Sequence, residues 1–473
     1  MTTHEGALDK KRIRKFVAAL TATTLAGMLT LATGVGVAQA QVGKTYDASV
    51  DETIADIQAY WTRTMPDVYG MQYESIPTNR VFPYSESNPP PSCEDGGKTT
   101  TPYQDISGNA FYCSNGDFVA YDEQGLIPEL RQKYGEFAVG LVFAHELGHA
   151  IQARVNYTPN EGVYLEQQAD CFAGSWAQHV ATSTDANVHL SKDDLDTALA
   201  GLLALRDPSG IDGSQDGAHG NGFDRVSAFQ DGYEGGAQAC ADYENNPPTV
   251  TEAAYTSQSD YQNDGNLSMQ ELLPLVTDSM KTYWTNATTK FTGATKLVAG
   301  DAGRAAASCP SGDQGVLDDA VVYCAASDTV TYDAARLAAE HDSIGDFAPA
   351  MLIATEYAAS VQHALGRDVQ STDARKASVC LAGAWAANVG NESGSSASPS
   401  GSAGDASSLS PGDLDEAISA LVASRSGNVD RGSAFDRVST FRKGFHNGPS
   451  ACVKSSSTAK SAGTSAGHKT TKV

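Results

Sequence analysis

Hydrophobic and polar positions along the chain predict mostly helices, interrupted by two short strands. Apolar residues recur at helical spacing over three stretches, near 54–65, 136–155 and 164–181. Two shorter runs rich in aromatic and apolar residues, Ala110–Cys113 and Phe118–Tyr121, predict strands. This pattern predicts an α+β fold in which helices dominate.

Two serines mark the starts of further helices. Ser191 can cap a helix together with Asp194, three residues later. Ser410 and Asp413 repeat this spacing, with Pro411 at the first helical position. We therefore expect one helix after Ser191 and a matching one after Ser410.

The chain contains the same series of motifs twice. The paired strings are Tyr60-Trp61-Thr62 with Tyr283-Trp284-Thr285, Tyr112-Cys113 with Tyr323-Cys324, Ala173-Gly174 with Ala382-Gly383, and Phe223–Ser227 with Phe435–Ser439. Their common order and nearly constant offset indicate a tandem duplication of one domain.

The predicted domain boundaries follow from this repeat. We call residues 45–243 the first half and residues 268–455 the second half. Residues 244–267 are polar, contain a Pro-Pro pair and are interpreted as a linker. The Ser- and Gly-rich stretch 390–410 is interpreted as a flexible insertion, and residues 456–473 as a disordered tail.

The chain has eight cysteines, four in each half at matching places. If each half folds alone, three pairings per half are possible. We favour the pairs Cys93–Cys113, Cys171–Cys240, Cys309–Cys324 and Cys380–Cys452. Disulfides of this kind are typical of exported proteins.

The N-terminus has the features of a secretory signal. Basic residues from Lys10 to Lys15 precede an apolar run from Phe16 to about Val37. Small residues around Ala38 and Ala40 then suit a signal peptidase, which makes residues 1–40 a cleaved signal peptide and the mature protein extracellular. The alternative is an uncleaved membrane anchor, but the Thr and Gly content of the run argues against it.

The net charge excludes one class of partner. The whole chain carries a formal charge of −25, and residues 1–40 contain a surplus of basic residues. A mature chain this acidic repels phosphate backbones and anionic membrane surfaces. We therefore expect no nucleic-acid binding. No segment after the signal is long and apolar enough to span a bilayer, so we also expect no stable membrane insertion after signal cleavage.

His145-Glu146-Leu-Gly-His149 lies within an apolar helical run. Residues four apart share one face of a helix, so two imidazoles at this spacing can bind one zinc ion. The glutamate after the first histidine can then reach a water molecule at the metal. The alternative is that His145 and His149 are two ordinary helix histidines and that the motif arose by chance.

The next predicted helix supplies what the motif lacks. Catalytic zinc takes three protein ligands and keeps one open position. Glu166, which follows His149 by 17 residues, can be the third ligand. Asp170 lies one turn further on the same helix face, where it could accept the free N–H of a ligating imidazole. This combination predicts a zinc site.

The strings from His145 to Gln152 and from Leu165 to Ala177 resemble the neutral zinc metallopeptidase family of bacteria. Ala110–Cys113, His219-Gly220 and Arg225 are similar to that family as well. The resemblance covers nearly all of the first half. It implies a zincin-type fold in which a glutamate, rather than a third histidine, completes the metal site, and an aspartate supports a histidine ligand.

These residues together suggest a secreted zinc peptidase. Zinc would lower the pKa of a water molecule toward ~7, and Glu146 would act as general base during attack on a peptide bond. His219 is a candidate donor to the oxyanion, with a plain surface histidine as the alternative. The other class of function is an exported, non-catalytic binding protein on the same fold.

Two further patterns leave alternatives open. The strand Phe118–Tyr121 could add an extended peptide at a sheet edge, or could be ordinary core structure. Asp260, Asp264, Gly265, Ser268 and Glu271 roughly follow the spacing of a calcium loop, but a helix cap made by Ser268 and Glu271 explains the same residues.

The second half offers an internal control, because it keeps the motifs for folding but not those for zinc. The corresponding positions hold Thr355 for His145, Ala359 for His149, Arg375 for Glu166, Val379 for Asp170 and Arg431 for His219, while Glu356 matches Glu146. We therefore predict a degenerate, non-catalytic second half.

Overall fold

The computed structural model describes residues 48–182, 190–215, 217–251, 253–255, 257–300, 309, 320–394, 409–424 and 432–452. The predicted signal peptide, most of the predicted insertion, Arg431 and the predicted tail lie outside these residues. Both halves belong to one compact unit, 44–473. Within the described ranges, no helix combines the length and the apolar character that crossing a membrane requires.

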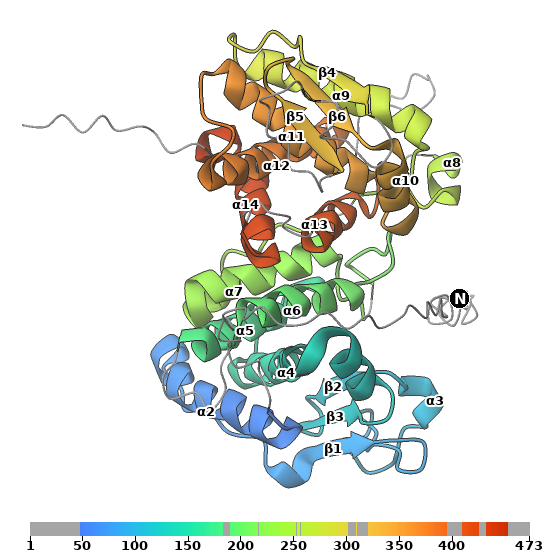
Figure 1. The fold of residues 1–473 in the computed structure, drawn as a ribbon. Helices are drawn as coiled ribbons and strands as arrows, with labels where there is room; N and C mark the ends of the chain where they lie inside the picture. The colour runs from blue at the N-terminus through green and yellow to red at the C-terminus, as the bar shows by residue number, and fades with distance from the viewer. Residues whose placement is uncertain are drawn as a thin grey trace, which may run out of the picture. The chain divides into compact units, whose positions relative to one another are not determined.

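The first half is built from a small sheet and a group of long helices (Figure 1). Its elements are α2 (Val50–Tyr69), η1 (Thr78–Arg80), β1 (Val81–Tyr84), α3 (Tyr103–Ile106), β2 (Ala110–Cys113), β3 (Phe118–Asp122), α4 (Leu126–Val155), α5 (Val163–Thr182), α6 (Lys192–Ala204) and α7 (Gly222–Asp242). The helix-dominated α+β class is confirmed.

The sheet has the order β1-β3-β2, with β1 parallel and β2 antiparallel to β3. All five residues of β3 are buried. Both edges of β3 are paired, so the idea that Phe118–Tyr121 adds a peptide strand is wrong and the core interpretation holds. The sequence pattern did not predict β1, because Pro83 argues against a strand; an edge strand tolerates it.

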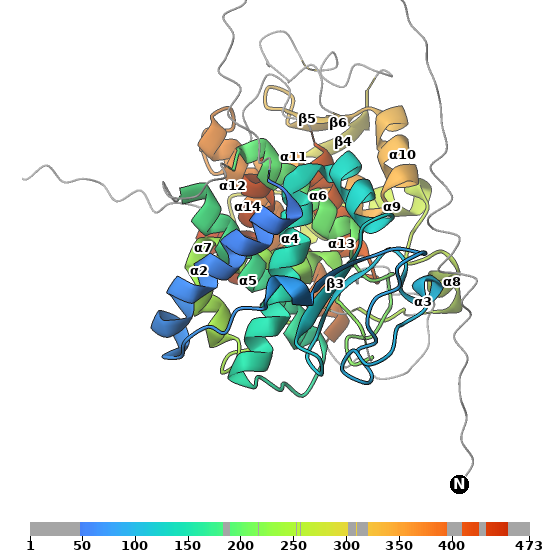
Figure 2. The same ribbon diagram turned by 90° about the horizontal axis from the view of Figure 1, so that it is seen from below.

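Helix α4 packs against the sheet on one side and against the other long helices on its remaining sides. It contacts β2 and β3, and it also packs against α2, α5 and α6 (Figure 2). The backbone of α4 leaves helical geometry at Gly135, where φ is 80°. The helix expected from Glu136 is thus the segment that follows this break, and a preceding segment begins at Leu126.

Helices α5 and α7 cross at very short distance because each presents a glycine to the other's backbone. A Cβ on Gly174 would overlap the carbonyl oxygen of Phe229, and a Cβ on Gly232 would overlap that of Cys171. The disulfide between Cys171 and Cys240 joins the same two helices. The repeated Ala-Gly string therefore marks a close helix crossing.

The second half has α8 (Gln258–Gln262) before it and repeats much of this plan. Its elements are α9 (Met269–Ala287), β4 (Lys296–Ala299), β5 (Val321–Cys324), β6 (Thr329–Tyr332), α10 (Ala334–Ser343), α11 (Phe347–Ala364), α12 (Thr372–Gly394), α13 (Asp413–Ala423), α14 (Ala434–Asn447) and η3 (Pro449–Cys452). Its sheet order β4-β6-β5 has the same parallel and antiparallel pairs as the first sheet. The duplication stays a prediction, and the shared topology is an argument for it.

The four predicted cysteine pairs are present in the structure. Cys93 is bonded to Cys113, Cys171 to Cys240, Cys309 to Cys324 and Cys380 to Cys452. Each half thus contains one short and one long disulfide loop.

The two predicted helix caps differ in outcome. Ser191 caps α6 with Asp194 as expected. In the second half the helix begins only at Asp413, after Gly412, so the prediction that Pro411 is its first residue is wrong. The Ser410 hydroxyl bonds instead to the Asp260 carboxylate at 3.1 Å, which draws it away from the helix terminus.

The predicted linker is anchored at several points. Thr251 donates to the buried Asp224 carboxylate through both its N–H and its hydroxyl. Just after the linker, Ser268 and Glu271 form the capping box of α9, as the alternative to a calcium loop predicted.

Candidate metal centre

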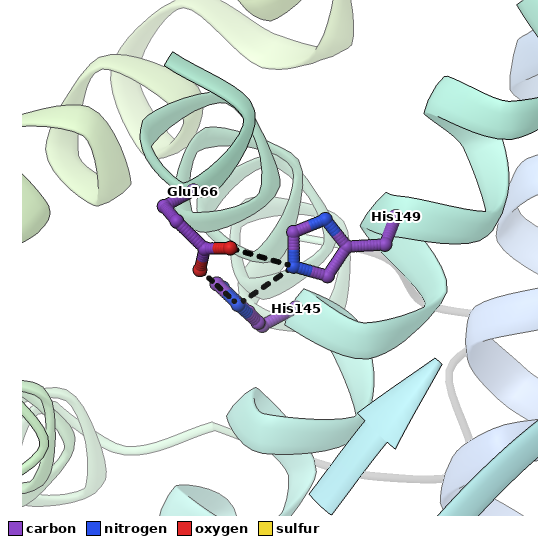
Figure 3. Close-up of side chains that lie close together, drawn as sticks. All are labelled: His145, His149 and Glu166. Atoms are coloured by element: carbon purple, nitrogen blue, oxygen red, sulfur yellow. Dashed lines mark hydrogen bonds and ion pairs between the residues drawn. The ribbon is translucent and has the colours of Figure 1, made fainter. Parts of the chain in front are cut away.

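Two adjacent helices of the first half bring His145, His149 and Glu166 together. The histidines lie one turn apart on α4, and Glu166 lies in the first turn of α5. Gly148, between the histidines, allows this approach, because a Cβ there would come within 3.0 Å of the Ala169 Cα. The three side chains point toward one another from the two helices (Figure 3).

The separations of the three ligand atoms fit a zinc ion. The two Nε2 atoms of His145 and His149 lie 3.2 Å apart. Glu166 places Oε2 3.2 Å from His145 Nε2 and Oε1 3.5 Å from His149 Nε2. Two ligand atoms at ordinary zinc distances from one tetrahedral ion are about 3.3 Å apart. In addition, Glu166 Oε2 is buried and accepts no well-formed hydrogen bond from the described residues.

Each histidine is oriented by a partner on its other ring nitrogen. His145 Nδ1 lies 2.8 Å from Asp170 Oδ1, and His149 Nδ1 lies 2.8 Å from Gln152 Oε1. Gln152 is in turn held by the bond from its Nε2 to the Leu165 carbonyl. These contacts leave both Nε2 atoms directed at Glu166, which is the tautomer and orientation that metal binding requires.

Arg225 from α7 completes the support of His145. Its Nε donates to Asp170 Oδ2 at 2.8 Å and its Nη2 to Asp170 Oδ1 at 3.0 Å. Both side chains are almost fully buried. This forked pair holds the carboxylate charged and in place beside the imidazole.

The electrostatics of the group favour a cation. Burial opposes ionisation of Glu166, yet the two histidines hold its pKa well below the usual range. Burial likewise opposes protonation of His145, but Asp170 and Glu166 outweigh it and raise the pKa of that imidazole to about 10. In the absence of another cation, Asp170 and Glu166 therefore favour the protonated form of His145, and Glu166 favours that of His149.

Glu146 lies beside His145, His149 and Glu166 and does not belong to this group of candidate ligands. Its Oε2 accepts a hydrogen bond of 2.8 Å from the backbone N–H of Tyr112 on β2. Burial raises the pKa of its carboxyl group. A buried carboxylate with a raised pKa next to a metal site suits proton transfer.

A cavity of about 130 Å³ opens next to this glutamate. Its polar lining consists of Asn109, His145, Glu146, His219 and Arg225, and leucines of α4 and α6 contribute apolar walls. His219 is half-exposed, and its backbone N–H donates to Asp207 Oδ2 at 2.7 Å. The structure thus places His219 at the same cavity as His145 and Glu146.

The matching positions of the second half contain no comparable group. Thr355 donates its hydroxyl to the Met351 carbonyl within its own helix, and Arg375 bonds to the Gln370 carbonyl. Glu356 still accepts from the Tyr323 N–H at 2.9 Å, as Glu146 does from Tyr112. The retained glutamate therefore joins helix to sheet in both halves.

Sequence reasoning missed the roles of Gln152 and Arg225. Gln152 follows His149 by three residues on the same helix, so helical spacing could have predicted that contact. Arg225 stands 55 residues after Asp170, and no local pattern connects the two.

Comparison with known proteins agrees with this geometry. Residues 33–243 match the profile of a family described as "Putative neutral zinc metallopeptidase". This segment is thus similar to that family. The second half lies outside the matched residues.

The relatives carry no description of function. The chain is 29% identical over 236 residues to "Uncharacterized protein YpfJ" of Escherichia coli K12, which covers 44% of this chain and 77% of the relative. It is also 29% identical over 151 residues to "Uncharacterized protein Rv2575" of Mycobacterium tuberculosis, covering 27% of this chain and 52% of that protein. No solved structure matches the chain.

Proposed function

We propose that the protein is a secreted zinc-dependent peptidase with one active site, in the first half. The observation that supports this most is the convergence of His145, His149 and Glu166 at separations of 3.2–3.5 Å, beside a buried glutamate that is not a ligand. Zinc held there would act as a Lewis acid and would lower the pKa of a bound water molecule to near neutral pH.

The residues of the chain have distinct parts in this proposal. Glu146 accepts the proton of the attacking water and returns it to the leaving amine of the cleaved peptide bond. Its hydrogen bond from Tyr112 N fixes one carboxylate oxygen and leaves the other for this transfer. His219, at the rim of the same cavity, donates to the oxygen of the peptide carbonyl as charge develops on it.

The substrate is a peptide or protein segment. The cavity beside Glu146 has leucine walls from Leu126, Leu130 and Leu202, which suit an apolar side chain. The second half contains no zinc ligands at the matching positions, and we propose that it has no catalytic role.

One comparison tests the enzymatic proposal. Zinc content and hydrolysis of unfolded casein are measured on the full chain and on Glu146→Gln. We expect one zinc per chain in both proteins and loss of activity only in the variant. Glu356→Gln, at the matching position of the second half, is the control and keeps full activity.

Absence of zinc and of hydrolysis in the wild-type protein would support a non-catalytic binding protein instead. Unchanged activity in Glu146→Gln would contradict this site as the source of the hydrolysis. Export is tested separately. The protein is recovered from the culture medium and its N-terminus is sequenced, with Gln41 expected as the first residue. A retained N-terminus in the membrane fraction would contradict secretion.

A further inference from the structure

The two halves meet through reciprocal contacts between a carboxylate and a helix N-terminus. Helices α6 and α7 pack on α13 and α14 (Figure 1). Asp415 on α13 accepts a hydrogen bond of 2.7 Å from the N–H of Phe223, at the start of α7. Asp196 on α6 accepts one of 2.9 Å from the N–H of Phe435, at the start of α14.

These two contacts use matching positions of the repeat. Asp196 and Asp415 each follow the first-turn aspartates Asp194 and Asp413 by two residues. Phe223 and Phe435 each begin the string Phe-Asp-Arg-Val-Ser. Each half thus supplies a carboxylate to the other half's helix.

The consequences of the two contacts differ, because only one of the capped helices reaches the metal centre. Asp415 also forms an ion pair with Arg206, with Nε and Oδ2 3.0 Å apart, and its side chain is 5% exposed. It therefore joins two segments of the first half, the residue just after α6 and the first turn of α7.

Arg225 is attached to both of these segments. It lies two residues after Phe223 on α7, and its Nη1 donates to the Leu205 carbonyl, next to Arg206, at 2.7 Å. Its remaining donors hold Asp170, whose Oδ1 lies 2.8 Å from His145 Nδ1. A displacement of either segment would move the guanidinium relative to Asp170.

We propose that Asp415 is a positioning residue for the metal centre of the other half. Its carboxylate fixes the two attachment points of Arg225, and Arg225 and Asp170 then orient His145. In this proposal the second half stabilises the geometry of the site in the first half through Asp415. This inference rests on the proposed zinc site.

The reciprocal contact is a matched control. Asp196 caps α14, whose Arg437 bonds to the carbonyl oxygens of Leu421 and Ser424. Its loss removes the same kind of bond from the same interface. None of these contacts of Asp196 and Arg437 involves Asp170, Arg225 or a proposed zinc ligand.

The experiment compares the full-length wild type with Asp415→Ala, Asp415→Asn and Asp196→Ala. Zinc affinity is measured by competition with a chromophoric chelator, and the visible spectrum of the cobalt-substituted protein reports ligand geometry. Because outer contacts of zinc ligands are typically worth 10–100-fold in affinity, we expect about a 5- to 10-fold loss for Asp415→Ala. Asp196→Ala should stay within about twofold. Asp415→Asn, which keeps an acceptor for Phe223 but loses the ion pair with Arg206, should be intermediate.

The outcomes separate the two proposals. A wild type that binds no zinc contradicts the proposed function. Equal affinities for wild type and both Asp415 variants, or equal losses for Asp415→Ala and Asp196→Ala, overturn the positioning role while leaving the zinc site in place. If Asp415→Ala does not fold, the comparison of Asp415→Asn with Asp196→Asn decides in the same way.

Discussion

Asp170 places one carboxylate oxygen 2.8 Å from Nδ1 of His145, inside the protein and away from water. The same carboxylate accepts two hydrogen bonds from Arg225. A single aspartate thus joins the imidazole of one helix to the guanidinium of another. We therefore expect the zinc affinity of the site to depend on Asp170.

Replacing Asp170 by Asn should weaken zinc binding without removing a ligand. The neutral amide no longer stabilises the imidazole, and it leaves Arg225 without its buried counter-charge. We expect zinc affinity to fall about 10- to 100-fold. Affinity is measured by chelator competition.

Asp117→Asn is the control for this substitution. Asp117 forms an ion pair with Arg154, with Oδ1 and Nη2 3.2 Å apart, and this pair includes none of the proposed zinc ligands. The backbone of Asp117 is left-handed, with φ of 48°, and Asn tolerates this conformation. Its zinc affinity should equal that of the wild type. If Asp170→Asn also keeps wild-type affinity, His145 does not depend on this contact.

Replacing His219 by Ala should reduce turnover but not zinc content. The side chain lines the cavity beside Glu146 and does not belong to the group of three ligand residues. Loss of one donor to a developing oxyanion costs about 10²- to 10³-fold in kcat. Steady-state kinetics and metal analysis measure the two quantities.

His219→Asn keeps an N–H donor and should recover part of that turnover. Loss of zinc from His219→Ala would show instead that this histidine takes part in metal binding. An unchanged kcat would make it a surface residue without a catalytic role.

The second half should lose stability as pH rises above about 4.5. Burial, together with Asp346, raises the pKa of Glu416 from its ordinary 4.5 to about 8, and burial raises the pKa of Asp346 to about 6. The folded chain therefore retains protons that the unfolded chain releases, so the free energy of unfolding decreases between about pH 4.5 and 8.

Glu416→Gln should reduce this dependence. The amide cannot ionise, and its oxygen can still accept the hydrogen bond that Glu416 receives from Phe347 N. Melting temperatures of both proteins are measured from pH 4 to pH 9 at one ionic strength. Curves that stay parallel over the whole range would mean that Glu416 titrates normally in the folded protein.

The close crossing of α5 and α7 predicts a large cost for a single added methyl group. In Gly174→Ala the new Cβ would overlap the Phe229 carbonyl, which belongs to a helix backbone and cannot rotate away. Overpacking typically costs about 1–3 kcal/mol of unfolding free energy, and we expect this substitution to reach the upper end of that range because the overlapped atom is backbone. Urea unfolding gives this value.

Gly162→Ala is the matched substitution, because nothing lies within 4 Å of its added Cβ. It should leave the unfolding midpoint within error of the wild type. Equal midpoints for Gly174→Ala and wild type would mean that the two helices can separate at no cost.

Much of the fold could be predicted because its signals are local. The strand Ala110–Cys113 and the helix expected over 164–181 were close to their observed bounds, since alternating or helical patterns reside in a few consecutive residues. The favoured cysteine pairs, one of three possible sets in each half, are the ones observed. Strand β1 was missed because its Pro83 is acceptable only at a sheet edge, and the edge is a property of the assembled sheet.

The candidate site likewise contains residues that local motifs predicted and contacts that they could not predict. The string around His145 and His149, with Glu166 and Asp170 one helix later, indicated a group that the structure brings together. The contacts of Arg225 with Asp170 and of Asp415 with Phe223 join positions 55 and 192 residues apart. Such contacts depend on how helices pack, which no short pattern in this chain reports.

The exchange between Asp196 and Asp415 has a consequence for assembly. Each half offers one carboxylate and one helix start, and each receives the same pair in return. A surface with this property is complementary to itself, as in dimers with a twofold axis. Having both partners in one chain keeps them at equal number and high local concentration. The second half keeps the face that contacts the first half, while the positions that match the zinc ligands hold Thr355, Ala359 and Arg375.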